Sequence, residues 1–173
     1  EAGDERASAW IERVAMASPV EARALGALLR VRQGRTGEAV PELEASLLAY
    51  REDPWPDPGL MRRVVQAAGD AAAANAGHAA RLLPALRAPF VLRAFEEERL
   101  VALAQAFSRL GPVPECAASI AALEPFVPWV RDWLELRARC YQAAADPRAG
   151  SARADLGVFL SREPMRFSDG LLP

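Results

Sequence analysis

Apolar residues recur every three or four positions along most of the chain, which is the spacing of one face of an α-helix. Representative series are Ala39, Leu43, Leu47 and Tyr50 in one segment, and Leu100, Leu103, Phe107 and Leu110 in another. No segment alternates apolar and polar residues with a period of two over a useful length, which is the pattern of a half-buried strand. The pattern therefore predicts helices throughout and no β-sheet.

Prolines divide this helical pattern into intervals of nearly constant length. Successive members of the series are 35, 35, 39 and 36 residues apart: Pro19, Pro54, Pro89, Pro128 and Pro164. Proline ends the helix before it and is tolerated at the first position of the next one, where its missing N–H would have no partner. A proline about every 35 residues therefore indicates the boundary between one pair of helices and the next.

Each interval also contains a second break near its middle. The breaks carry turn-forming residues and lie at 34–37, 75–77, 111–114 and 146–147. Two breaks per interval predict a helical hairpin in each one. The expected hairpins span about 19–52, 54–87, 89–126 and 128–163, preceded by one helix at 4–16 and followed by an irregular tail at 164–173. Because a single hairpin cannot bury its apolar face, stacked neighbours must do so, and we expect one helical-repeat domain over residues 1–163.

The first hairpin resembles a tetratricopeptide repeat. Residues 25–29 (LGALL) resemble the packing pattern of that family's first helix, 33–40 (QGRTGEAV) resemble its turn and second helix, and Asp53-Pro54 resembles its closing pair. The later hairpins keep the period but lose the signature, and Pro84 and Pro125 would shorten or kink their helices. The resemblance implies an all-α fold of eight or nine helices, arranged as a right-handed stack of antiparallel hairpins that binds proteins or peptides.

A second resemblance lies in the segment 50–58 (YREDPWPDP) and the following Met61-Arg62-Arg63. It is similar to the helical extensions of spermidine-synthase-like proteins of GC-rich bacteria. This resemblance implies an accessory or regulatory C-terminal domain that lacks the catalytic part. The chain begins at Glu1 without Met, so we expect it to be a module of a larger bacterial protein.

Charge and hydropathy restrict the class of partner. The 21 basic and 23 acidic residues give a formal net charge of -2, whereas nucleic-acid-binding domains usually carry a basic excess. No apolar run approaches the roughly 20 residues that span a bilayer. We therefore expect neither nucleic-acid binding nor membrane insertion, and the bacterial cytoplasm is slightly favoured as the compartment.

The sequence contains no recognised catalytic motif. It lacks nucleophile-elbow, zinc-protease and phosphate-loop patterns, and all basic residues except one histidine are arginine. We expect that histidine, His78, to be a surface or capping residue, and the run from Glu96 to Arg99 to be a solvated helix face. Cys116 and Cys140 form no CxxC pair or disulfide framework and are expected to be buried thiols. The chain is thus predicted to be no enzyme and to need no cofactor or metal.

The candidate binding residues are arginines on the first helices of hairpins two to four, because such helices line the concave surface of a repeat stack. They are Arg62, Arg63, Arg93 and Arg131, with Trp55 as an aromatic anchor. They could form a groove for a peptide carboxylate or an acidic segment. The alternative is that these arginines are solvated and paired with Glu and Asp. Likewise Trp55, Trp129 and Trp133 are either core residues at hairpin junctions or interface anchors.

The sequence therefore predicts a non-catalytic protein-interaction or scaffolding module, within its parent chain or with a separate partner. Two alternatives stay open: the accessory domain of a synthase-like protein, and a closed helical bundle with a small-molecule pocket. Molecular shape distinguishes the interaction module from the closed bundle, because a repeat array is elongated whereas a bundle is compact.

Overall fold

The computed structural model describes residues 6–111 and 113–162. Within these residues the chain forms nine α-helices, one short 3₁₀ helix and no strand. The elements are α1 (Arg6–Ala15), α2 (Pro19–Arg32), α3 (Thr36–Ala49), α4 (Pro58–Ala74), α5 (Ala76–Arg87), η1 (Arg93–Phe95), α6 (Glu96–Leu110), α7 (Val113–Ala121), α8 (Arg131–Ala143) and α9 (Ala149–Arg162). The predicted all-α class is confirmed, whereas the predicted tail at 164–173 lies outside the described residues.

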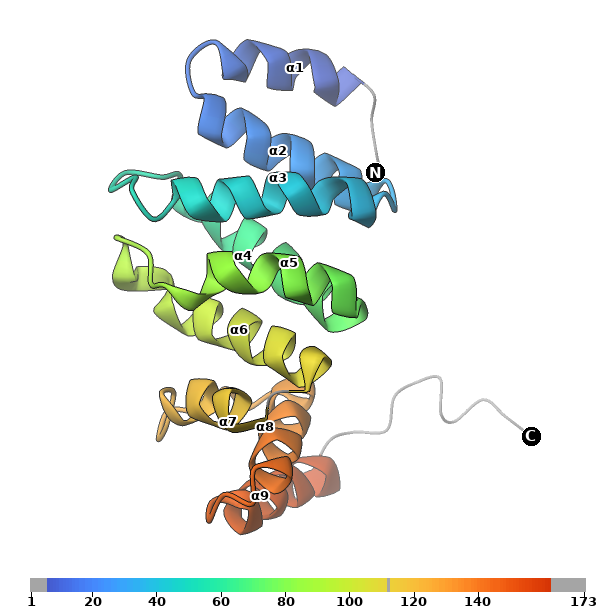
Figure 1. The fold of residues 1–173 in the computed structure, drawn as a ribbon, viewed down its shortest axis with the longest axis vertical. Helices are drawn as coiled ribbons and strands as arrows, with labels where there is room; N and C mark the ends of the chain where they lie inside the picture. The colour runs from blue at the N-terminus through green and yellow to red at the C-terminus, as the bar shows by residue number, and fades with distance from the viewer. Residues whose placement is uncertain (1–5, 112, 163–173) are drawn as a thin grey trace, which may run out of the picture.

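The helices stack along one axis, with α1 at one end and α9 at the other (Figure 1). Each helix packs against its neighbours in the chain, and α2, α4, α6 and α8 also pack against one another in that order. These four helices form one side of the stack, which we call the even-helix face. The elongated arrangement with contacts between neighbours confirms the predicted stack of helices.

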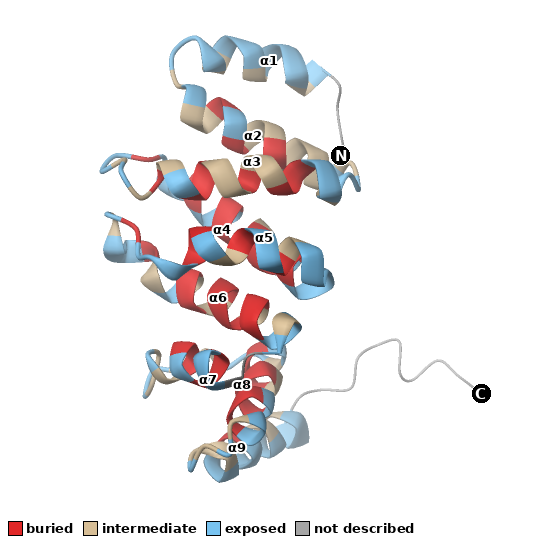
Figure 2. Ribbon diagram, viewed as in Figure 1, coloured by how far each residue is buried: buried red, intermediate tan, exposed pale blue. Residues whose placement is uncertain are grey.

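Buried side chains form a continuous core from α2 to α8 (Figure 2). The ends of the stack differ from the middle, because α1 has no buried residue and α9 buries only Ala152. Large apolar side chains such as Trp10 and Met16 at one end and Leu160 at the other are consequently exposed. The stability of the fold thus resides in the inner helices.

The four members of the proline series within the described residues fall at boundaries between helix pairs, and one of these four begins a helix, whereas Pro164 lies outside the described residues. Pro19 is the first residue of α2, whereas Pro54, Pro89 and Pro128 lie in the connections before η1, α4 or α8. The predicted boundaries are therefore confirmed for these three, although none of them takes the first position of a helix. Before α4 the reason is visible, because Asp57 caps the helix by accepting a hydrogen bond from the Leu60 N–H at 2.6 Å and Pro58 takes the first position.

The four mid-interval breaks all coincide with connections between helices. The tightest is Asn75, which alone separates α4 from α5. Its side-chain oxygen accepts hydrogen bonds from the backbone N–H groups of Gly77 and His78 at 2.8 and 3.2 Å. An N-cap of this kind satisfies donors that a helix start leaves unpaired.

Helices α4 and α6 approach closely at a small residue. A Cβ on Gly69 would lie 3.1 Å from the Cβ of Ala102 and 2.3 Å from the side-chain oxygen of Gln105. Glycine at this buried position therefore allows the two even-face helices to pack at short range.

Two arginines bind the carboxyl end of α5, where the following Ala88 is extended and Pro89 has no N–H to donate. Arg51 donates to the carbonyl oxygens of Pro84 and Ala85 at 2.5 and 2.8 Å. Arg99 is only 4% exposed, donates to the Leu86 carbonyl at 2.5 Å and pairs with Glu96 at 2.6 Å. The expected solvated face is therefore wrong for Arg99, which is a buried cap on a neighbouring helix.

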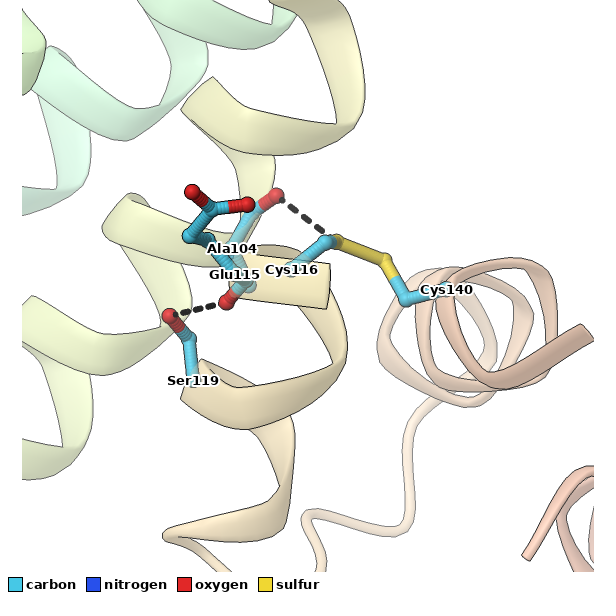
Figure 3. The surroundings of a disulfide bond; sticks show 5 residues. All are labelled: Ala104, Glu115, Cys116, Ser119 and Cys140. Atoms are coloured by element: carbon cyan, nitrogen blue, oxygen red, sulfur yellow. Dashed lines mark hydrogen bonds between the residues drawn. A yellow bond between two sulfur atoms is a disulfide. The ribbon is translucent and has the colours of Figure 1, made fainter. Parts of the chain in front are cut away.

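A disulfide joins Cys116 in α7 to Cys140 in α8 across 24 residues (Figure 3). Both residues lie on buried helix faces, as the sequence indicates, but the expectation of free thiols is wrong because the two faces meet. The Cys116 sulfur also lies 3.4 Å from the carbonyl oxygen of Ala104 in α6. Since an oxidised sulfur carries no proton, this approach is a packing contact that brings α6, α7 and α8 together.

Arg137 is a buried ionic link in the same region, with 4% of its surface exposed. It donates to Glu124 in the α7–α8 connection at 2.8 Å and to Asp155 in α9 at 2.7 Å. The Tyr141 hydroxyl donates to the same Glu124 at 3.1 Å. Burial, with this carboxylate as a second cause, raises the pKa of Tyr141 to about 12. These bonds hold α9 and the α7–α8 connection against α8.

Candidate functional site

The structure places three of the four candidate arginines beside carboxylates. The closest nitrogen–oxygen distances are 3.0 Å from Arg62 to Glu98, 3.9 Å from Arg93 to Glu96, and 3.0 Å from Arg131 to Glu135. The guanidinium of Arg62 also lies 5.4 Å from the centre of the Phe95 ring. In these positions the arginines bridge or support helices, and their charge is offset locally.

The other two candidate residues lie apart from these pairs. Arg63 donates to the Gly59 carbonyl at 3.3 Å within α4 and lines a cavity described below. Trp55 belongs to the α3–α4 connection and is 88% exposed, so the core interpretation is wrong for it. The core interpretation is also wrong for Trp129, which is 51% exposed and packs edge-on against Phe159, whereas it is confirmed for the buried Trp133.

A cavity of about 620 Å³ opens between α1, α2 and α4, and we call it the apolar cavity. Its walls include Trp10 and Val14 from α1, Leu25 and Leu28 from α2, and Ala67 and Ala71 from α4. Cavities of this size with mainly apolar walls are typical places for a bound side chain or ligand. Helix α1 contributes to this wall although it buries no residue of its own.

A second cavity of about 580 Å³ lies further along the even-helix face, between α4, α6 and α8, and we call it the acidic cavity. Four of its lining residues are carboxylates: Asp70, Glu97, Glu98 and Asp132. The described lining residues include no arginine. This cavity is therefore the opposite in charge of the anion-receiving groove that the sequence suggested.

A third cavity of about 530 Å³ adjoins the acidic one and is mixed in charge. It shares Asp70 and Asp132 with the acidic cavity and adds Arg109 and Arg139. Asp70 lines all three cavities, so they form one series from α1 and α2 across α4 to α6 and α8, with Asp70 at the junction. A further cavity of about 520 Å³ between α1, α2 and α3 adjoins the apolar cavity, with which it shares Ile11 and Leu29.

Three of the four carboxylates of the acidic cavity have no arginine partner among the described residues, whereas Glu98 pairs with Arg62. Elsewhere acidic side chains pair with arginine, as in Glu42 with Arg30 at 2.5 Å and Glu44 with Arg81 at 2.7 Å. Asp70, Glu97 and Asp132 make no ion pair or side-chain hydrogen bond with any described residue. Partial burial without a compensating cation raises the pKa of Asp70 above its ordinary value. Arg63 and Arg109 line the adjoining cavities and have no carboxylate partner among the described residues either, so the face carries unpaired charges of both signs.

A buried donor also adjoins the acidic cavity. Trp133 lines it and is almost fully buried, and its indole N–H has no hydrogen-bond partner among the described residues. Most buried polar groups in proteins are paired. The donor is enclosed by the protein, so it stays unpaired inside the fold next to the cavity wall.

Sequence reasoning missed this acidic series because its members come from three different helices. The available signal was weak: Gln66 and Asp70 are polar residues four positions apart, beside the apolar stripe of α4. That spacing shows a shared helix face, but it does not show that Glu97 and Asp132 meet it.

The described residues contain no group of three or more His, Cys, Asp or Glu side chains arranged to hold a metal ion. None of the described helices is long and apolar enough to cross a bilayer. His78 is partly buried in the first turn of α5 and donates its backbone N–H to Asn75, so the helix cap is Asn75 and not His78.

No protein-family model matches this chain, and no curated protein or solved structure matches it either.

Proposed function

We propose that the chain is a non-catalytic interaction module that binds a segment of another protein, or of its own parent chain, along the even-helix face. The observation that carries this proposal is the series of three adjoining cavities joined by Asp70. An extended surface of successive helices is the way in which helical stacks contact partners. The module presents this surface as a rigid body and performs no covalent chemistry.

The composition of the surface supports the same proposal. The face offers apolar walls at the α1–α2–α4 end and polar groups at the α4–α6–α8 end. Protein interfaces combine an apolar centre with polar groups that fix register and specificity. The exposed Trp10 stands at the apolar end, and tryptophan is enriched among residues that dominate binding energy.

The test is a selection of random displayed 12-residue peptides on the intact chain, followed by measurement of the affinity of the enriched peptides. Ala67 faces the apolar cavity on α4, so Ala67→Arg should block it and weaken binding at least tenfold. Ala80 is exposed on α5, so Ala80→Arg is a matched control that should change affinity less than threefold. Equal effects of the two variants, or no enriched peptide at all, would contradict the proposed surface.

A further inference from the structure

We infer that the chain pairs with a second copy of itself through one edge of the stack, as a two-fold symmetric dimer. The edge consists of the connections that follow α1, α3, α5 and α7, and we call it the connection edge: residues 16–18, 50–57, 88–92 and 122–130. The first three run along the left side of the stack in Figure 1, and the fourth begins there. Of these residues only Val130 lines one of the three adjoining cavities, so the inference goes beyond the proposed function.

The exposed residues of the connection edge are almost all apolar. Fourteen of its residues are exposed, and of these only Glu52 and Asp57 are charged. Surface turns usually carry Gly, Asn, Asp and Ser instead. Large apolar side chains are exposed in every one of the four connections: Met16, Trp55, Val91, Phe126, Trp129 and Val130. Exposed apolar surface that gathers in one region marks an interaction site.

The connections at the opposite edge provide an internal comparison. These follow α2, α4, α6 and α8, and their described residues expose no large apolar side chain. Their exposed members are Gly34, Arg35, Asn75, Gly111, Ala145 and Pro147. Apolar exposure is therefore a property of one edge of this stack and not of its connections in general.

Trp55 is held in its exposed position by its neighbours. It lies between Pro54 and the buried Pro56, and its backbone N–H donates to the side chain of Asp53 at 2.8 Å. Because proline fixes its own backbone angle φ, this connection is ordered before any partner arrives. A preordered anchor loses less conformational entropy on binding than a flexible one.

The charges of the two middle connections identify the partner as a second copy. Residues 50–57 expose Glu52 and Asp57, whereas 88–92 is flanked by the exposed Arg87 and Arg93. Glu52 makes no ion pair within the described chain, and Arg87 contacts the Phe107 ring at 5.7 Å but no carboxylate there.

A two-fold axis between these two connections places each of them against the other in the second copy. Glu52 then faces Arg87 of the second copy, and the symmetry makes the same contact twice. The outer connections, 16–18 and 122–130, expose no charged residue and are paired with each other by the same axis. An interface of this symmetry requires a surface that is complementary to itself, and the connection edge has this property in both charge and apolarity.

The available area is sufficient for a dimer. A fully covered Phe or Trp side chain buries about 150–250 Å², so Trp55, Phe126 and the half-exposed Trp129 offer on the order of 500 Å² per copy. Met16, Val91 and Val130 bring the edge close to the roughly 800 Å² per partner of a standard interface.

Sedimentation velocity of the intact chain at about 1–200 μM tests the inference through the concentration dependence of its mass. We expect a monomer–dimer equilibrium in this range. Trp55→Ser should weaken the dimer at least tenfold, because the anchor is lost from both copies. Trp55 is 88% exposed, so the fold should be retained, and circular dichroism checks this. A parent chain that stays monomeric throughout, or a Trp55→Ser variant that dimerises as well as the parent, would overturn the inference.

An exchange of charges tests the two-fold arrangement itself. Glu52→Arg and Arg87→Glu should each weaken the dimer, because like charges then meet at both contacts. An equimolar mixture of the two variants should dimerise at least tenfold more tightly than either alone, since every Arg again faces a Glu. The control Glu115→Arg reverses an exposed charge in the first turn of α7, at the opposite edge, and should change dimerisation less than threefold. A mixture that is no tighter than the single variants, or a control as weak as Glu52→Arg, would reject this interface.

Sedimentation and peptide selection report on different surfaces. A monomeric chain that still enriches peptides rejects the dimer and keeps the proposed function. A chain that dimerises as described but enriches no peptide keeps the dimer and rejects the proposed function.

Discussion

Helices α2 to α5 and helices α6 to α9 are held together by different interactions. In the first half, leucines on α3 and α5 such as Leu43 and Leu82 are fully buried, and the ionic contacts there are partly exposed. In the second half, α7 has only nine residues, and a disulfide and the buried Arg137 join it and its neighbours to α8. Where helices are too short to bury much apolar surface, covalent and ionic links replace that packing.

The largest expected effect is the loss of the Arg137 side chain. Arg137→Gln would leave Glu124 and Asp155 without their cation in a partly buried site, which costs about 3 kcal/mol of unfolding free energy. Arg30→Gln breaks a single pair with side chains 33% and 32% exposed, so it should cost less than about 1 kcal/mol. Urea unfolding of both variants measures the difference, and similar losses would show that the two halves are not held differently.

Reduction of the disulfide should come next. Opening a covalent loop of 24 residues restores disorder to the unfolded chain and costs on the order of 2–3 kcal/mol. Hydrogen exchange should show the loss of protection in α7, α8 and α9, while the amides of α3 and α5 keep theirs. Equal loss of protection along the whole stack would instead indicate one cooperative unit.

Substitution of glycine by alanine should change the stability of the fold in opposite directions in the two halves. Gly69→Ala places a methyl group against Ala102 in the closest α4–α6 contact, so it should destabilise the fold by about 1–2 kcal/mol. Gly157 lies within α9 with open space around it, so Gly157→Ala should stabilise by up to about 1 kcal/mol through helix propensity. Thermal unfolding of the two variants tests the signs, and a Gly69→Ala variant that is as stable as the parent, or more stable, would refute the close contact.

The smallest effects concern pH. Hydrogen bonding to Arg99 lowers the pKa of Glu96, so its contribution to stability is present at neutral pH and is lost as pH falls through its folded-state value. Burial raises the pKa of Asp70, so the folded state favours the protonated carboxyl. Ionisation of Asp70 therefore lowers the stability of the fold as the pH rises. Glu96→Gln should therefore lower stability at pH 7 and cost progressively less as the pH falls through the folded-state pKa of Glu96. Asp70→Asn should raise stability by a few tenths of a kcal/mol at pH 7, and unfolding curves over a series of pH values check both.

The fold could be predicted from the sequence because helix periods and helix breaks are each set by residues that are close together in the chain. Turn residues such as Gly34, Asn75 and Gly111 interrupt a helical period, and each break needs only a few neighbouring residues to be recognised. What it could not predict depends on which helix faces meet. Cys116 and Cys140 were assigned to buried faces, but only the packing of α7 on α8 brings them together.

The candidate site was harder to predict for the same reason. Asp70, Glu97 and Asp132 are 27 and 35 residues apart, and each taken alone is an ordinary polar residue on a helix. The pairing of the candidate arginines was hard to predict too, since the sequence shows Arg62 and Glu98 but not the contact between α4 and α6 that joins them. The exposed Trp55 likewise depends on the path of a connection that no helical period describes.

The disulfide also limits how far the chain can be extended by force. If the two ends of the chain are pulled apart, the helices of the first half can unravel and extend fully. The segment between Cys116 and Cys140 stays closed on itself, which hides about 80 Å of contour length for its 24 residues. A force–extension record should lengthen by that amount once a reductant is added, so tension would distinguish oxidised from reduced chains even when both are completely unfolded.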